Sequence, residues 1–326
     1  MTLLRLSSTA LSRCRFALSP LAETLGVLIA LHRPCGEPWL APWHARHQAD
    51  YRRWLARDTL AGGLLPLVAA TKWLPALVAL PPGGGMRTRL ADELAVMATY
   101  SDEQVRSTVA DAVAASWEPQ DTGWLALDGL GPRAAAVFEQ GWERFVAPDW
   151  PRRRAVLERD IVYRAGLLAA YGWKYAVQTL RQRSVWVGDN AIRFSDQEWP
   201  DRWIEDGLIF VPRTTGGGWW TCERPPHYAL VYPAHGPAAP AGDTGADALS
   251  TLLGSGRARV VRELARPATS TQLAQALGVS LGTVSAHLAV LREAGVVAGV
   301  RSGRHVLYSR TVRGDRFVTA LDADPQ

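Results

Sequence analysis

The sequence predicts a mainly α-helical protein with small β elements, folded as two domains. Apolar residues recur at helical spacing over most of the chain, whereas strand-like stretches are short and few. All fourteen tryptophans lie between Trp39 and Trp220. Ten arginines and six acidic residues follow from Gly245 onward, while the preceding region is almost neutral. Two regions of such different composition indicate two domains.

Helix start signals divide the first 180 residues. Ser19 and Pro20 predict a helix start, because serine accepts hydrogen bonds from first-turn N–H groups and proline fits the first helical position. Ser101 and Gln104 have the spacing of a capping box. The predicted helices cover residues 19–31, 44–57, 101–113, 132–146 and 151–180, the last bent near Gly172.

The stretch from Leu60 to Leu80 is the most apolar in the chain. Pro66 and Pro75 interrupt it, and Lys72 near its centre would cost about 2.5–3.5 kcal/mol in a bilayer. It therefore predicts two short buried helices and no membrane span. The three cysteines form no close pair, and the N-terminus lacks the apolar core of a signal peptide. We therefore expect a cytoplasmic protein.

A small β portion is predicted at about residues 184–233. It comprises a hairpin, at 185–187 and 191–194 around a Gly-Asp-Asn turn, and two further strands at 208–211 and 229–232. Residues 236–246 are rich in glycine, proline and alanine and have no apolar period, which is typical of a linker. The predicted domains are therefore 1–235 and 247–320.

Four short helices are predicted after the linker, at 249–253, 257–264, 272–277 and 281–293. Only three residues separate the last two. Gly278 supplies the positive φ that a tight helix exit needs, and Ser280 caps the helix that follows. In that helix Val284, Leu288 and Leu291 form one apolar stripe. The two helices therefore cross steeply over a shared core, which is a helix-turn-helix.

A two-stranded hairpin follows the helix-turn-helix. Residues 296–301 and 305–310 alternate between apolar and polar side chains around Ser302 and Gly303. The basic residues expected at its tip are Arg301, Arg304 and His305. A helix-turn-helix followed by such a hairpin is a winged helix, and the hairpin can reach DNA phosphates or the minor groove.

The segment TSTQLAQALGVSLGTVSAHLAVLREAGVV, with the wing RSGRHVLYSR, resembles the ArsR/SmtB family of bacterial transcription regulators. The similar residues are Thr283, Val284 and Ser285, His287 and Leu288, and Gly303, Arg304 and Tyr308 in the wing. Over residues 249–310 the resemblance implies a repressor that binds a double-stranded, inverted-repeat operator as a homodimer. Its half-sites would lie about 10–10.5 bp apart, or a multiple of that.

The N-terminal region is similar to an uncharacterised helical domain found ahead of such regulators. The pieces that carry this similarity are FALSPLAET, RAVLERDIVYRAGLLAAYG, LIFVP and LVYPAHG. The similarity gives no ligand. We expect this domain to supply dimer contacts, to sense a small molecule, or both.

The residues expected to contact DNA lie on the helix-turn-helix and the wing. The second helix is poor in long polar side chains, so few bidentate base contacts are expected, and Thr283 and Ser285 would offer hydroxyl contacts instead. His287 either touches DNA or packs inside the domain, and Arg292 either touches DNA or lies on a solvated face. The full predicted set is Thr271, Gln272, Ser280, Gly282, Thr283, Ser285, His287, Arg292, Arg301, Arg304 and His305.

Metal sensing and protein interaction are alternative functions. The resemblance to ArsR/SmtB regulators implies two places for a metal site, a Cys-x-Cys pair on the helix before the helix-turn-helix or Asp and His ligands on a C-terminal helix. Here the matching stretch Arg262–Arg266 contains no thiol, and Asp315, Asp322 and Asp324 have no histidine near them. We therefore predict no metal site, since such a site needs several nitrogen or sulfur ligands. A winged helix used only for protein contact would not need a basic hairpin tip.

An N-terminal enzyme is the other alternative. The sequence has no nucleophile-elbow motif, no phosphate-binding glycine loop and no dense His/Glu cluster, so no catalytic residue and no cofactor are predicted. Glu158 and Asp160 alternate with Arg159 and precede Arg164. This pattern favours an exposed, salt-bridged helix face over acid–base catalysis.

Most tryptophans are expected in the core, because indole rings bury a large apolar area. Trp219 and Trp220 differ, since they end the glycine-rich loop that begins at Thr214. They are candidates for a lid over an apolar or aromatic ligand. The alternative is a surface hairpin that packs back on its domain.

Overall fold

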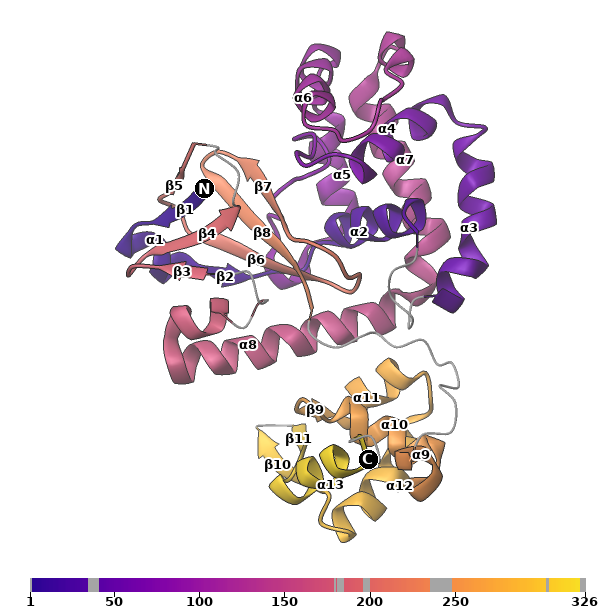
Figure 1. The fold of residues 1–326 in the computed structure, drawn as a ribbon, viewed down its shortest axis with the longest axis vertical. Helices are drawn as coiled ribbons and strands as arrows, with labels where there is room; N and C mark the ends of the chain where they lie inside the picture. Colours follow the sequence, from indigo (N-terminus) through magenta and orange to yellow (C-terminus); the bar gives the residue numbers. More distant parts are fainter. Residues whose placement is uncertain are drawn as a thin grey trace. The chain divides into compact units, whose positions relative to one another are not determined.

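The computed structural model of the chain describes residues 2–34, 41–178, 180, 185–195, 200–234, 248–302 and 305–322. These residues group into two units (Figure 1). Unit 1 comprises Met1–Asp149 and Arg164–Pro237, and unit 2 comprises Trp150–Tyr163 and Ala238–Gln326. The predicted linker, 236–246, lies outside the described residues.

Helices build the larger part of unit 1. They are α1 (Ser8–Arg13), α2 (Pro20–His32), α3 (Ala41–Leu55), α4 (Thr59–Ala69), α5 (Leu90–Ala98), α6 (Asp102–Ala114) and α7 (Leu130–Phe145), with the 3-10 turns η2 (Gly85–Arg87), η3 (Gly123–Ala126) and η4 (Ala147–Asp149). Helix α8 (Trp150–Gln178) begins in unit 2 and ends in unit 1. Its backbone breaks at Gly172, where φ is 78°, as the sequence predicted.

Helix α2 is the buried centre of unit 1 and lies between a sheet and the other helices (Figure 1). The predicted start is confirmed, since the Ser19 Oγ accepts a hydrogen bond from the Ala22 N–H at 2.9 Å. Ten of the thirteen residues are buried, which fits a helix that is apolar on all sides. Helix α7 crosses it closely at Gly141, where an added Cβ would lie 3.0 Å from the Leu28 Cδ1.

Two four-stranded sheets complete unit 1, in the orders β3-β4-β1-β5 and β2-β6-β8-β7. The strands are β1 (Thr2–Leu6), β2 (Arg15–Phe16), β3 (Val185–Val187), β4 (Ala191–Ser195), β5 (Arg202–Ile204), β6 (Leu208–Arg213), β7 (Trp220–Arg224) and β8 (His227–Pro233). Strand β1 is antiparallel to β4 and parallel to β5, so the chain's first strand sits between two of its later ones. Side chains from both sheets share one apolar cluster that includes Leu4, Ile192, Phe210 and Leu230.

Unit 2 places five short helices and a small sheet beside the first part of α8. The elements are α9 (Ala248–Leu253), α10 (Ser255–Glu263), β9 (Ala268–Thr269), α11 (Ser270–Leu277), α12 (Leu281–Glu293), β10 (Val297–Ser302), β11 (His305–Arg310) and α13 (Val312–Asp322). The sheet has the order β10-β11-β9. Its helices and strands share one core, in which Val260, Leu273, Val284 and Leu288 are almost fully buried.

The β part of the protein is larger than predicted. The hairpin of β3 and β4 is confirmed, with Val185 opposite Arg193 and Val187 opposite Ala191, and so are the strands β6 and β8. Strands β1, β2, β5 and β7 were not predicted. They are short, and β1 finds its partners nearly two hundred residues later, which no local pattern can reveal.

The apolar stretch 60–80 forms one helix instead of the two predicted. Helix α4 accommodates Pro66, but the residues after Ala69 leave the helix. Their polar groups bond to the end of α6 instead. The Thr71 Oγ1 donates to the Ala112 carbonyl oxygen at 2.7 Å, and the Lys72 N–H donates to that of Ala115 at 3.2 Å. The prediction of a second helix was therefore wrong.

No single helix among the described residues is long and apolar enough to cross a membrane. Only α11 and α12 taken together reach such a composition, and they meet at a bend of 116°.

Candidate nucleic-acid interface

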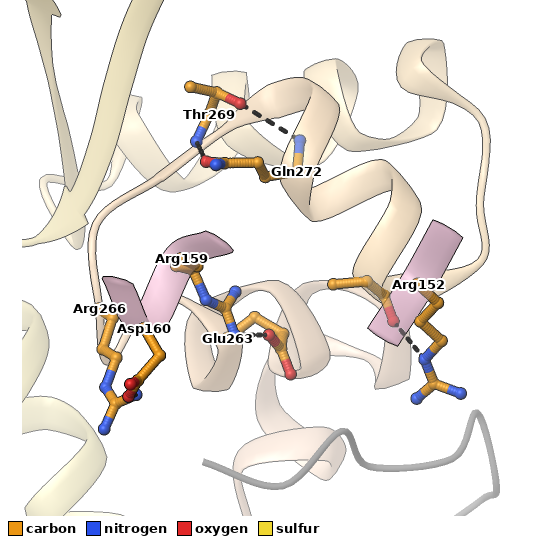
Figure 2. Close-up of polar contacts among 8 residues, drawn as sticks. Arg152, Arg159, Asp160, Glu263, Arg266, Thr269 and Gln272 are labelled. Carbon is orange, nitrogen blue, oxygen red and sulfur yellow. Dashed lines mark hydrogen bonds and ion pairs between the residues drawn. The ribbon is translucent and has the colours of Figure 1, made fainter. Parts of the chain in front are cut away.

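The two helices of the predicted helix-turn-helix are fixed by local caps. The Thr269 Oγ accepts from the Gln272 N–H at 3.2 Å, and the Gln272 Oε1 accepts from the Thr269 N–H at 2.9 Å (Figure 2). This capping box starts α11. Gly278 ends it with a φ of 65°, in the left-handed region that glycine adopts without strain. The Ser280 Oγ then accepts from the Thr283 N–H at 3.1 Å and starts α12.

Apolar side chains hold the two helices at their steep angle. Leu273 of α11 and Val284 of α12 are fully buried, and Leu288 and Leu291 are nearly so. Val284, Leu288 and Leu291 form the predicted stripe, which packs with Leu273 in the core of unit 2. The bend of 116° between α11 and α12 falls in the range of a DNA-binding helix-turn-helix. The opposite face of α12 is therefore free to enter a groove.

Several predicted DNA-contacting residues gather on that face and at its start. Ser280, Gly282, Thr283 and Ser285 are all exposed, and the Ser280 and Thr283 hydroxyl groups bond to each other at 2.8 Å. The small Ala286 beside them is also exposed. This surface offers hydroxyl groups and methyl groups but no long polar side chain, as predicted.

Other predicted residues have structural roles or lie apart. Gln272 is half-buried and its amide oxygen serves the capping box, while Thr271 is exposed. His287 is half-buried against α10, because a Cβ added to Gly256 would lie 2.6 Å from the His287 Nε2. Packing is thus one role of His287. Arg292 is exposed at the end of α12.

The wing is a regular hairpin. Arg301 of β10 lies opposite Val306 of β11 and is exposed. Arg304 lies outside the described residues, and of His305 only the backbone pairing with Ser302 is described. The structure adds a strand that was not predicted, since β9 pairs with β11 immediately before the capping box. This pairing fixes the wing to the start of α11.

The first part of α8 belongs to unit 2, which the sequence did not indicate. The Arg159 Nη2 lies 2.6 Å from a Glu263 carboxylate oxygen, and the Arg266 Nη1 lies 3.1 Å from a carboxylate oxygen of Asp160 (Figure 2). Asp160 is fully buried and Arg159 is 7% exposed. The expectation of an exposed face was therefore wrong for both, because α10 and the segment after it cover them.

Arg164, expected on the same exposed face, is also fully buried. It belongs to unit 1, where its guanidinium carbon lies 4.8 Å from the centre of the Tyr232 ring. Glu158 accepts a hydrogen bond from the exposed Arg154 at 2.7 Å. Of the four residues predicted on this face, only Glu158 forms a salt bridge at the surface.

Two arginines donate hydrogen bonds to the end of α11, where helix carbonyl groups have no partner inside the helix. The Arg152 Nε of α8 donates to the Ala276 carbonyl oxygen at 2.9 Å (Figure 2). The Arg259 Nη2 of α10 donates to the Leu277 carbonyl oxygen at 2.8 Å. Sequence reasoning missed both, because neither arginine lies near these carbonyls along the chain.

Trp219 and Trp220 lie in unit 1. With Lys72, Trp73 and Glu223 they line a cavity of about 80 Å³. The loop before them is anchored, since the buried Arg213 donates to the carbonyl oxygens of Thr215, Gly216 and Gly218. Its guanidinium carbon lies 4.7 Å from the centre of the Trp220 ring.

The described residues contain no group of three or more His, Cys, Asp or Glu side chains that could hold a metal ion.

Comparison with known proteins agrees with this geometry. A family model described as a helix-turn-helix domain matches residues 256–300, which span nearly all of α10 and continue through α11, α12 and the first part of β10. Searches of the curated proteins and of the solved structures found no match. The helix-turn-helix domain indicates a DNA-binding regulator of transcription.

Proposed function

We propose that the protein is a cytoplasmic repressor that binds a double-stranded operator through α12 and the wing. The observation that carries this proposal is the exposed start of α12, held at a steep angle to α11 by a buried apolar stripe. A helix presented in this way fits the major groove. The small side chains on it favour hydroxyl contacts, thymine methyl contacts and shape readout.

The operator would be an inverted repeat read by a homodimer. One recognition helix covers only a few base pairs, and a two-fold dimer doubles the number of specific contacts. The resemblance to ArsR/SmtB regulators supports this arrangement. Half-sites would then be separated by one DNA turn, about 10–10.5 bp, or a multiple of it.

Unit 1 would supply the dimer contacts and sense a small molecule rather than catalyse a reaction. The cavity lined by Trp73, Trp219 and Trp220 supports a role in binding a small group, because its volume is about 80 Å³ and it combines aromatic walls with the charged Lys72 and Glu223. The anchored Arg213 loop gives the cavity a fixed wall. A ligand would change DNA affinity only as far as it binds one state of the dimer better than the other.

DNA binding is tested by incubating the full chain with fragments of the host genome at 50 and 200 mM salt. We expect retention of a small set of fragments that share an inverted repeat, with affinity falling steeply as salt rises. If the chain retains no duplex DNA at 50 mM salt, the proposed function as a DNA-binding regulator is refuted. Sedimentation of the bound complex tests the dimer, since two chains per operator are expected.

The sensing role is tested on the selected operator. Small aromatic and apolar compounds are screened for release of the DNA, and active compounds are repeated with Trp219→Ala and with Trp203→Ala. Trp203 is the matched control, because its side chain is 69% exposed and lies outside the cavity. Only the Trp219 variant should lose the response. An equal response in both variants would remove this cavity from the proposal.

A further inference from the structure

The recognition helix α12 presents no positive charge at its start, so cations that contact DNA phosphates must come from other parts of unit 2. Its exposed residues at the start are Leu281, Gly282, Thr283, Ser285 and Ala286, none of which carries a charge. Specific DNA complexes gain much of their affinity from cations placed against phosphates. Among the described residues of the wing, the exposed Arg301 provides one such cation. A second source is α10, which packs against α12 through Gly256 and His287.

Helix α10 borders both parts of the helix-turn-helix. At its start, the Gly256 backbone lies against the imidazole of His287 in the middle of α12. One turn later, the Arg259 guanidinium reaches the last turn of α11 and bonds to the Leu277 carbonyl oxygen at 2.8 Å. In helix-turn-helix complexes the first helix, here α11, crosses the DNA backbone while the second, here α12, enters the groove. The Arg259 guanidinium lies at the end of α11, beside the turn into α12, so phosphates that flank the groove would pass within its reach.

The contact that Arg259 makes differs from the contacts of Arg159 and Arg266. Arg159 and Arg266 each contact a carboxylate, so their charges are offset within the unit. The contact that Arg259 makes is with a neutral carbonyl group, and no ion pair of Arg259 occurs among the described residues. Its positive charge is therefore retained. One hydrogen bond also leaves other N–H groups of the five in a guanidinium.

The carbonyl bond prepares the side chain for a second partner. A long arginine side chain loses rotamer freedom when it binds a phosphate, and that loss weakens binding. The bond to Leu277 already restricts the half-buried Arg259, so less freedom remains to be lost. The planar guanidinium can then contact the backbone carbonyl with one edge and a phosphate with another.

We propose that Arg259 is a phosphate-binding residue of the DNA interface, on the α10 side of the recognition helix. This proposal rests on the proposed function and adds a second cationic contact area, separate from the wing. It gives affinity without sequence preference, because a phosphate carries no base information.

The test measures the salt dependence of DNA binding by the full chain and by Arg259→Gln. Glutamine can still donate to the Leu277 carbonyl but carries no charge. We expect the magnitude of the slope of log affinity against log salt to fall by about 1.8, which is about 0.9 for each of the two Arg259 phosphate contacts that a dimer makes. The affinity gap to the wild type should therefore narrow roughly 12-fold between 50 and 200 mM salt. Operator and random DNA should be affected alike.

Two further variants separate the outcomes. Arg259→Lys keeps the charge and should keep the slope. Arg133→Gln is the matched control in unit 1, because the Arg133 Nε also donates to a backbone carbonyl, that of Asp128 at 2.8 Å. It removes the same charge and should leave the slope unchanged.

A weakened affinity with an unchanged slope in Arg259→Gln would show that Arg259 only holds the end of α11, and would overturn the proposal. An unchanged affinity and slope would overturn it as well. Failure of the wild type to bind DNA would instead refute the proposed function itself. If Arg259→Gln does not fold, an Arg259→Lys slope lower than the wild type's would overturn the proposal.

Discussion

The two units bury acidic groups in different ways. In unit 2 the carboxylates of Asp160 and Glu263 meet arginines from a distant part of the chain. In unit 1 the carboxyl group of Glu93 accepts hydrogen bonds from the Ser19 hydroxyl and the Leu21 N–H. Ion pairs fix which segments of unit 2 lie together, whereas the Glu93 carboxyl group is held by hydrogen bonds from a hydroxyl and an amide group while burial raises its pKa. The difference predicts a response to mutation in unit 2 and a response to pH in unit 1.

The largest expected effect is on the ion pairs of unit 2. In the Asp160→Asn variant, the largely buried Arg266 guanidinium loses the carboxylate of Asp160, which lies 3.1 Å from it. Removing one partner of a buried pair typically costs about 3–5 kcal/mol of unfolding free energy. Hydrogen exchange of the α10 and α11 amides should therefore accelerate strongly, while that of α2 in unit 1 stays as it is.

The control for this prediction is Glu158→Gln, which removes an exposed pair on the same helix. Exposed pairs contribute only about 0–1 kcal/mol, so exchange should barely change. Equal exchange in both variants would show that α8 contributes nothing to the stability of unit 2.

The second prediction concerns the pH response of unit 1. Burial raises the pKa of Glu93 from 4.5 to about 8, against the opposing effect of the Ser19 hydrogen bond. Between these values the folded chain holds a proton that the unfolded chain has lost, so the unfolding free energy falls as pH rises from about 4.5 to 8. Glu93→Gln should flatten this dependence, which urea unfolding at several pH values measures.

A pH profile that keeps its slope in Glu93→Gln would assign the titration to another group. Unit 2 offers the comparison within one chain. Because Glu93 belongs to unit 1, exchange of the α11 amides in unit 2 should not follow the same profile between pH 5 and 8.

The elements that sequence predicted best are those whose signals are local. Thr269 and Gln272 are three residues apart, and so are Ser280 and Thr283, so each cap could be inferred from its spacing. The exposed face of α12 followed from the same helix period. Most of the candidate interface was therefore predictable.

The parts that sequence did not reveal depend on distant partners. Arg159 and Asp160 look like a solvated pair of charges until Glu263 and Arg266, more than a hundred residues later, are placed beside them. The same holds for β1 and for the arginines at the end of α11. A local pattern gives the period of a helix, but it cannot say which charged face another element will cover.

The third prediction compares two glycines inside unit 2. Gly278 has a φ of 65°, so Gly278→Ala forces alanine into the left-handed region at a cost of about 1–2 kcal/mol. Gly282 has no such conformation and lies in the exposed first turn of α12. Gly282→Ala should therefore stabilise the helix, by up to about 1 kcal/mol.

Thermal unfolding measures both variants, and the sign of the two changes is the test. DNA affinity adds a second readout for Gly282→Ala. Weaker operator binding by a more stable protein would place the Gly282 backbone close to DNA. Unchanged DNA affinity would indicate that the start of α12 does not contact DNA.

The smallest expected effect is on base readout. The double variant Thr283→Ala and Ser285→Ala removes the hydroxyl groups of the exposed α12 face and leaves the buried stripe intact. We expect the ratio of operator to random affinity to fall about 10-fold, or about 1.4 kcal/mol over all the hydroxyl groups removed, since a single hydroxyl contact is weaker than a bidentate base contact at about 1–3 kcal/mol. Random affinity and its salt slope should stay as they are, in contrast to Arg259→Gln. A parallel loss for random DNA would mean that these hydroxyl groups bond to phosphates, and α12 would then bind DNA without reading its sequence through them.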